Sequence, residues 1–231
     1  MENHSYSLGT QNSTLTQVFF TQVYSWMFAG LLTTGFFAYY TANSPAFLSL
    51  IYGNNFIFFG LIIVELGIVI ALSAKIDSFN VSTSRFLFFV YSALNGLTMA
   101  AIFIIYTYES IATTFFITAT TFGIMSIYGY VTKADLSKLG SILIMALIGL
   151  ILATIVNIFL KSEAFMWVLT YAGILIFVGL TAYDTQKLKK IANSIENENT
   201  LAKISVIGAL TLYLDFINLF LYLLRIFGKR R

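Results

Sequence analysis

The sequence predicts an all-α polytopic membrane protein, a bundle of seven transmembrane helices. Two observations support this prediction: the composition of the chain and the lengths of its apolar segments. Of its 231 residues, 58% are hydrophobic and only 10% are charged, whereas a soluble domain carries about 25% charged residues. Its apolar segments reach the length of about 20 residues that a helix needs to cross a bilayer. The segments are too long and too little alternating for barrel strands, and open sheets cannot span lipid.

The elements follow in order along one membrane domain, 18–228, between a polar N-terminal tail, 1–17, and a basic C-terminal tail, 229–231. The tail 1–17 has no basic stretch ahead of an apolar core, so we expect a short flexible segment and no cleavable signal peptide. The seven predicted spans are 18–42, 54–74, 86–107, 111–131, 139–160, 165–184 and 203–226. The joint after the third span is so short that the third and fourth spans must form a tight hairpin.

The distribution of Lys and Arg predicts the orientation, because basic residues concentrate on the cytoplasmic side. The side of the N-terminus holds eight: Lys75, Arg85, Lys133, Lys138, Lys187, Lys189, Lys190 and Lys203. The other side holds five: Lys161, Arg225, Lys229, Arg230 and Arg231. We therefore expect a cytoplasmic N-terminus and an external C-terminus. A re-entrant last segment would instead place all the basic clusters on one side.

The residue types that are scarce exclude several classes of function. The chain has no Cys, one Pro and a single His, His4, in the polar tail. This excludes disulfide scaffolds, zinc sites and the Ser-His-Asp triad. No nucleotide-binding fingerprint is present, and the net charge of +3 is small. We expect no enzyme activity, no cofactor and no nucleic-acid partner.

Asp215 is the most informative residue, because it lies in the middle of the apolar run 201–227. A carboxylate at the centre of a span costs roughly 2.5–3.5 kcal/mol on insertion scales, so it usually marks an ion or proton pathway with a partner. Glu65 and Asp184 are the candidate partners. The structural alternatives are that Asp215 bonds to Tyr or Asn neighbours, that Asp184 is an interfacial helix-end charge, and that Glu65 bonds across to Asn95 or Asn157.

Three motifs resemble the bacterial branch of the Bax inhibitor-1 family, also called the transmembrane BAX inhibitor motif family. They read FGIMSIYGYVTKADLSKLG (122–140), GLTAYDTQKLKK (179–190) and GALTLYLDFINLFLYLLRIFG (208–228). The resemblance runs from the second span to the C-terminus. It implies a seven-helix bundle whose last helix is enclosed by the other six. It also implies a pH-sensitive calcium leak across the membrane, expected here in the bacterial cytoplasmic (inner) membrane.

The same resemblance implies roles for individual residues. The paired aspartates of the family match Asp184 and Asp215. A basic residue near the end of the second helix is expected to latch one aspartate in the closed state, and Lys75 is the candidate. Lys75 would act as a point charge, without the bidentate fork of an Arg. The expected partners are membrane lipid and calcium or other cations, besides a possible unknown membrane protein.

The chemistry of two carboxylates supports a pH response without a His. Two carboxylates in an apolar site cannot both ionise cheaply, so the pair shares a proton and titrates in two steps. When both are ionised, Asp184 and Asp215 offer hard oxygen ligands suited to calcium. Asp184 lies near the end of its predicted span, and Asp215 lies roughly 18 Å of helix beyond Lys203. Straight, upright helices would not bring the two level, so we expect tilt or a later start of the last helix.

Three functions remain open on these grounds. A pH-gated cation leak is the leading prediction. A regulatory membrane protein that acts through helix contacts with another membrane complex is the second, and a proton-coupled transporter of a small solute is the third. Calcium flux in liposomes discriminates between them, because a leak needs no partner whereas a regulator would be silent.

Overall fold

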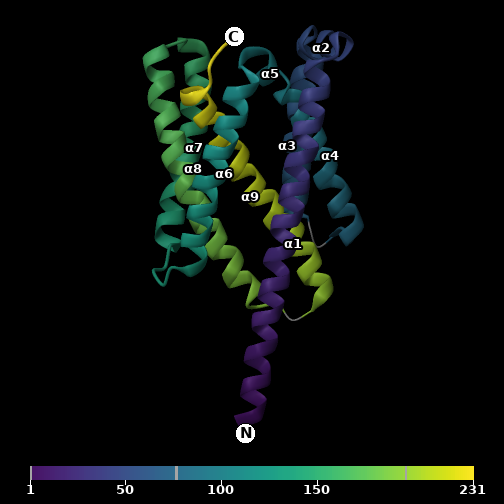
Figure 1. Cartoon of the computed structure of the whole chain (residues 1–231), viewed down its shortest axis with the longest axis vertical. Coiled ribbons are helices and arrows are strands. Elements are labelled where there is room, and N and C mark those ends of the chain that lie inside the picture. The colour runs from purple at the N-terminus through teal and green to yellow at the C-terminus, as the bar shows by residue number, and fades with distance from the viewer. Residues whose placement is uncertain (1, 76–77, 196) are drawn as a thin grey trace. The chain divides into compact units, whose positions relative to one another are not determined.

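The computed structural model of the protein (Figure 1) describes residues 2–75, 78–195 and 197–231, with side chains from Leu15 onward. The helices are α1 (Glu2–Ala42), α2 (Pro45–Tyr52), α3 (Asn55–Ala74), α4 (Val81–Met99), α5 (Ala101–Ile105), α6 (Tyr108–Val131), α7 (Ser137–Leu160), α8 (Glu163–Ala192) and α9 (Glu198–Phe227). The predicted all-α class is confirmed, because the described residues contain no strand beyond one isolated bridge between Tyr106 and Arg230.

Six stretches of the described chain are long and apolar enough to cross a membrane. They are Asn55–Ala74, Val81–Ile105, Tyr108–Val131, Ser137–Leu160, Glu163–Ala192 and Glu198–Phe227. These correspond to the second to seventh predicted spans. The last of them is one unbroken helix of 30 residues, roughly 45 Å long, which favours a full span over a re-entrant loop.

α1 differs from its prediction in two respects. It is not among the six apolar stretches found in the described chain, so the expected count of seven spans is not confirmed. The physical reason is that Thr, Gln, Ser and Gly are interspersed along 18–42 and dilute its hydropathy. The helix also begins at Glu2, so residues 2–17 are helical where the sequence predicts a flexible tail.

The chain divides into two compact units. Unit 1 holds Met1–Ile105, Ile191–Tyr213 and Arg231, and unit 2 holds Tyr106–Lys190 and Leu214–Arg230. α9 therefore contributes its first half to unit 1 and its second half to unit 2. In the most apolar 18-residue stretch of α9, 67% of the residues are buried, whereas the corresponding share is at most 39% in the other five candidate spans.

In unit 1, α4 packs against α1 and α3, and α2 contacts both α1 and α3. Asparagine side chains begin two of these helices: Asn54 accepts from the backbone N–H of Phe56 at 2.9 Å, and Asn80 accepts from that of Thr83 at 2.7 Å. Such caps satisfy backbone donors that the first helical turn leaves free. They explain why α3 and α4 start where the polar joints end.

In unit 2, α7, α8 and α9 share a hydrophobic core. Its buried members are Leu150, Leu169, Ile176, Phe177, Leu180, Leu219 and Leu223. The C-terminal residues pack back on the start of α6, where the backbone N–H of Thr107 donates to the carbonyl of Lys229 at 2.9 Å. This core fixes the facing surfaces of α8 and α9, which carry the two predicted aspartates.

Candidate functional site

Asp184 and Asp215 meet inside unit 2. The predicted span 165–184 implied that Asp184 ends its helix. α8 instead continues to Ala192, so Asp184 lies within the helix. Asp184 is 9% exposed and Asp215 is 4% exposed. Their side chains are hydrogen-bonded to each other, so the offset expected from straight helices does not separate them. A hydrogen bond between two carboxyl groups requires a proton on one of them, because ionised carboxylates only accept.

Asp215 is withdrawn from solvent beside an aromatic contact between α9 and α6. The next residue along α9, Phe216, packs edge-on against two rings of α6, with centroid distances of 5.3 Å to Phe115 and 5.5 Å to Phe122. The Oδ2 atom of Asp215 is buried and has no hydrogen-bond partner among the described residues. A buried polar atom without a partner is costly and calls for an explanation. This oxygen is therefore available to a proton or a cation.

Two features beside Asp184, a charge and a hydroxyl contact, were not predicted from the sequence. Lys187 lies three residues further along α8, is exposed, and acts on Asp184 through its charge. The i, i+3 spacing on one helix could have revealed it. The hydroxyl groups of Ser126 and Thr185 lie 2.9 Å apart and join α6 to α8 beside Asp184; no pattern in the sequence signals that contact.

Glu65 belongs to unit 1 and has local partners. Its carboxylate accepts from the hydroxyl of Thr98 at 3.0 Å and from the amide of Asn95 at 3.4 Å. Asn95 in turn accepts from the hydroxyl of Tyr213 at 3.0 Å, and Tyr213 shares a 2.6 Å hydrogen bond with Thr34. Of the two bonding partners proposed from the sequence, the structure shows Asn95. Glu65 is part of this buried polar chain across α3, α4, α9 and α1, and a pathway role for it stays a prediction.

Lys75, the candidate latch, is exposed and forms the C-cap of α3 in unit 1. Asp184 lies in unit 2. The ion pair that the resemblance implies between Lys75 and Asp184 therefore stays a prediction.

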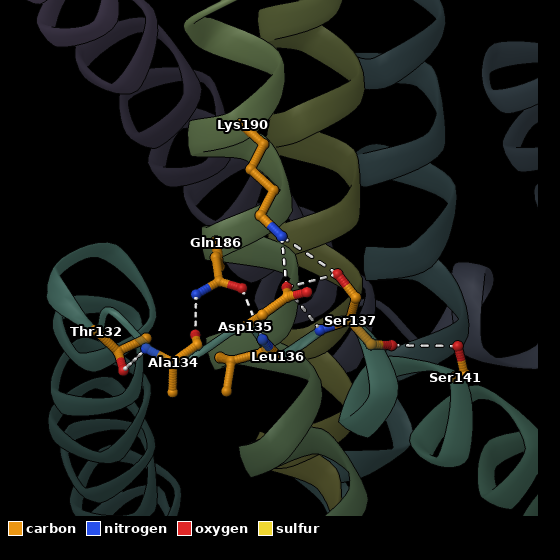
Figure 2. A network of polar contacts seen from close by, with 8 residues as sticks. All are labelled: Thr132, Ala134, Asp135, Leu136, Ser137, Ser141, Gln186 and Lys190. Carbon is orange, nitrogen blue, oxygen red and sulfur yellow. Dashed lines mark hydrogen bonds and ion pairs between the residues drawn. The ribbon is translucent and has the colours of Figure 1, made fainter.

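The joint between α6 and α7 is fastened to α8 by a polar network (Figure 2). Lys190 pairs with Asp135 at 2.6 Å, and the Ser137 hydroxyl donates to the same carboxylate at 2.8 Å. The hydrogen bonds from Lys190 and Ser137 lower the pKa of Asp135 to about 2. The Asp135 carboxylate therefore stays ionised throughout the neutral range, and its contribution is lost only as the pH falls toward 2. It cannot sense pH near neutrality.

The buried part of the same network is Gln186. Its Oε1 accepts from the backbone N–H of Leu136 at 2.9 Å, and its Nε2 donates to the carbonyl of Ala134 at 2.8 Å. In Figure 2 the Gln186 side chain points from α8 into the joint between these two residues. The joint is thus held to α8 by an amide that satisfies one backbone donor and one backbone acceptor.

Replacing Gln186 by Met should destabilise the protein by about 1–3 kcal/mol, because the buried N–H of Leu136 would lose its acceptor. Thermal unfolding of the purified protein in detergent would measure this. The matched control is Asp135→Asn, which removes the solvent-exposed ion pair and should leave stability at pH 7 nearly unchanged. A variant pair with equal unfolding temperatures would contradict this role of Gln186.

Calcium binding has clear geometric limits here. No group of three or more His, Cys, Asp or Glu side chains gathers in the part of the chain that the structure describes. Calcium takes six to eight oxygen ligands, so Asp184 and Asp215 supply only part of a coordination shell.

The comparisons with known proteins agree with the resemblance drawn from the three motifs. A family model described as inhibitor of apoptosis-promoting Bax1 matches residues 16–231. The inner membrane protein YbhL of Escherichia coli K12 is 57% identical over 217 residues, 93% of each chain. An uncharacterized protein of Borreliella burgdorferi is 44% identical over 92% of each chain. An uncharacterized membrane protein of Streptococcus pyogenes is 35% identical, over 95% of this chain and 96% of the relative.

Proposed function

This chain belongs to the family of inhibitors of apoptosis-promoting Bax1, and from that premise we propose that it is a pH-sensitive cation leak with calcium as the permeant ion. It is an integral membrane protein with six apolar helices in its described residues, and its similarity to an inner membrane protein supports the inner membrane as its location. The observation that carries the proposal is the buried, hydrogen-bonded carboxyl pair of Asp184 and Asp215. No cofactor or covalent chemistry is required.

The pair would couple protons to the cation in a simple way. With one proton bound, the two carboxyl groups hold α8 and α9 together through their hydrogen bond. Without it, two negative charges face each other in a buried site, and they repel strongly unless a cation neutralises them. A proton and a divalent cation therefore compete for the same oxygens, Oδ2 of Asp215 among them.

The remaining parts of the expected architecture complete the proposal. α1 would be a seventh span, because its exposed apolar side chains Phe28, Leu32 and Phe36 recur every four residues and form one outward stripe of the kind that faces lipid. The N-terminus would be cytoplasmic and α9 would be enclosed by the other helices, as its burial suggests. Lys75 remains the candidate latch for the closed state.

Calcium affinity should rise with pH, because protons and calcium compete for the same carboxylate oxygens. Each proton displaced from the pair changes the apparent affinity by at most about tenfold per pH unit. Binding should release protons as it occurs. Calorimetry on the purified protein in detergent, between about pH 6 and 8 where such a switch acts, would measure both effects. The trend should vanish in the Asp184→Asn/Asp215→Asn double variant and persist in Asp135→Asn. Affinity that does not depend on pH, or a trend that survives the double substitution, would remove this pair from the mechanism.

A further inference from the structure

A cavity of about 330 Å³ lies in unit 2, apart from the aspartate pair. Three helices line it, each near the end that faces the α7–α8 joint or the C-terminus. Its lining includes the polar side chains of Thr154, Asn157, Asn218, Tyr222 and Arg225, and the thioether of Met166. Thr154 and Asn157 belong to α7, Met166 to α8, and the other three to α9. The proposed leak uses none of these groups, so the cavity needs its own explanation.

Asn157 presents a free donor to this cavity. The residue is 4% exposed, and its Oδ1 accepts from the backbone N–H of Ser162 at 3.2 Å. That contact fixes the orientation of the amide, since a backbone N–H requires an acceptor. The Nδ2 donor therefore faces away from Ser162, and it has no acceptor among the residues described. A nearly buried donor of this kind in a cavity wall points to an acceptor on a ligand.

Arg225, an exposed residue of α9, supplies a positive charge to the lining of the cavity. Its Nη1 donates to the sulfur of Met166 at 2.8 Å and to the hydroxyl of Thr170 at 3.3 Å. The ion pairs in the described part of the chain do not include Arg225. Its Nε and Nη2 edge remains unoccupied, and this edge matches two oxygens of a phosphate or carboxylate. Arg225 is thus positioned by neutral contacts and lacks an anion.

The depth and the mouth of the cavity indicate a lipid. α7 ends at Leu160 and α8 begins at Glu163, so the cavity lies where these spans leave the apolar core of a bilayer. Ile158, which lines it, is 65% exposed, so the mouth opens on the outer apolar surface. Nearby, the exposed rings of Trp167 and Tyr171 lie 6.1 Å apart, and such aromatic residues gather at headgroup level.

We propose that this cavity binds the headgroup of an anionic phospholipid, a phosphatidylglycerol, with its acyl chains along the exposed apolar flank. Arg225 of α9 holds the phosphodiester through its free edge, and Asn157 of α7 donates to it. Asn218 uses its amide nitrogen on the carbonyl of Leu214 at 2.8 Å, which leaves its Oδ1 to accept from a glycerol hydroxyl. A choline headgroup offers no such donor and would bring a second cation beside Arg225.

The test is a binding titration of the full chain in detergent, with short-chain phosphatidylglycerol, short-chain phosphatidylcholine and inorganic phosphate as separate probes. Wild type should bind phosphatidylglycerol about tenfold or more tightly than phosphatidylcholine, because only the glycerol headgroup donates to Asn218 and the choline cation is repelled by Arg225; about 1.4 kcal/mol, tenfold, is the scale of one hydrogen bond. It should also exceed inorganic phosphate by at least that factor, because only the lipid adds acyl-chain contacts. Equal binding of the two lipids would overturn the choice of headgroup. Tight binding of inorganic phosphate alone would show a site for a free anion and would overturn the lipid assignment.

Variants locate the site. Arg225→Gln should lose that preference, and Arg225→Lys, which keeps the charge but loses the fork, should lose part of it. Asn157→Asp retains the acceptor for Ser162 but replaces the free donor by a carboxylate, so it should weaken binding as well. The control is Lys161→Asn, which removes one charge at the same exposed end from a residue outside the cavity, at a left-handed position that Asn tolerates. An equal loss in Lys161→Asn would mean general charge attraction and would overturn the site; unfolding temperatures without lipid identify any variant that is simply misfolded.

Discussion

Replacing Asp215 by Asn should abolish the pH-dependent part of the calcium flux, with a loss of about tenfold or more in rate, while the protein still inserts and folds. The substitution keeps the size of the side chain but removes its charge and its titration. A charge-assisted contact to a cation is worth more than about 1.4 kcal/mol, the equivalent of a tenfold change. Although Asp215 is nearly fully buried, the Asn amide can donate to the Asp184 carboxylate in place of the shared proton, so the substitution should not prevent folding.

Purified protein in liposomes loaded with a calcium dye would measure this flux across the neutral range. Asp135→Asn is the matched control, because it also removes one carboxylate of the same unit. Asp135 is exposed and its pKa of about 2 places its titration far from the pH values tested. The proposal fails if Asp215→Asn retains the wild-type flux and pH profile. Wild type that conducts nothing would favour the regulatory function instead.

Where the sequence is uniformly apolar, it predicts this fold well. The span expected at 54–74 is observed as Asn55–Ala74, and that at 139–160 as Ser137–Leu160. Long apolar runs bounded by turn and charged residues leave little choice of boundary. α1 is the opposite case, because its mixture of Thr, Gln, Ser and aromatic residues supports a helix without reaching the hydropathy of the other spans.

The end of α8 shows that the end of an apolar run need not be the end of a helix. The apolar run stops at Asp184, but the helix continues to Ala192 because Lys and Gln are good helix formers. Basic residues in its last turn, Lys189 and Lys190, also complement the helix dipole. Asp184 is therefore held within a helix, and it reaches Asp215 although the expected positions of the two spans would have offset them.

The contacts that complete each site join residues far apart in the chain. The sequence singled out Asp184 and Asp215 by their charge in apolar runs. Nothing in the local pattern pairs Gln186 with Leu136, or directs Asn157 and Arg225 into one cavity. Such contacts depend on which faces of the helices meet, and the apolar pattern of a lipid-embedded helix does not mark that face, since side chains toward lipid and toward protein are both apolar.

At Gly129, α6 lies directly against the backbone of α8, and a substitution there would test this helix contact. A Cβ at this position would collide with the carbonyl oxygen of Ala182 and lie 2.8 Å from its carbonyl carbon. These are backbone atoms that cannot rotate aside, so the two helices would have to separate. Overpacking of this kind typically costs about 1–3 kcal/mol, more than the gain of up to about 1 kcal/mol in helix propensity from Gly to Ala.

We therefore expect Gly129→Ala to lower the unfolding temperature and also to weaken the pH dependence of flux, because Ala182 lies two residues before Asp184 on the displaced helix. Gly123→Ala is the control on the same helix: nothing lies within 4 Å of a Cβ there, so only the propensity gain remains and the protein should be unchanged or slightly more stable. Thermal unfolding in detergent and liposome flux on both variants would decide the matter. If the two substitutions have equal effects, α6 and α8 do not approach each other at Gly129 as closely as the structure shows, and the position of Asp184 must be held by other contacts.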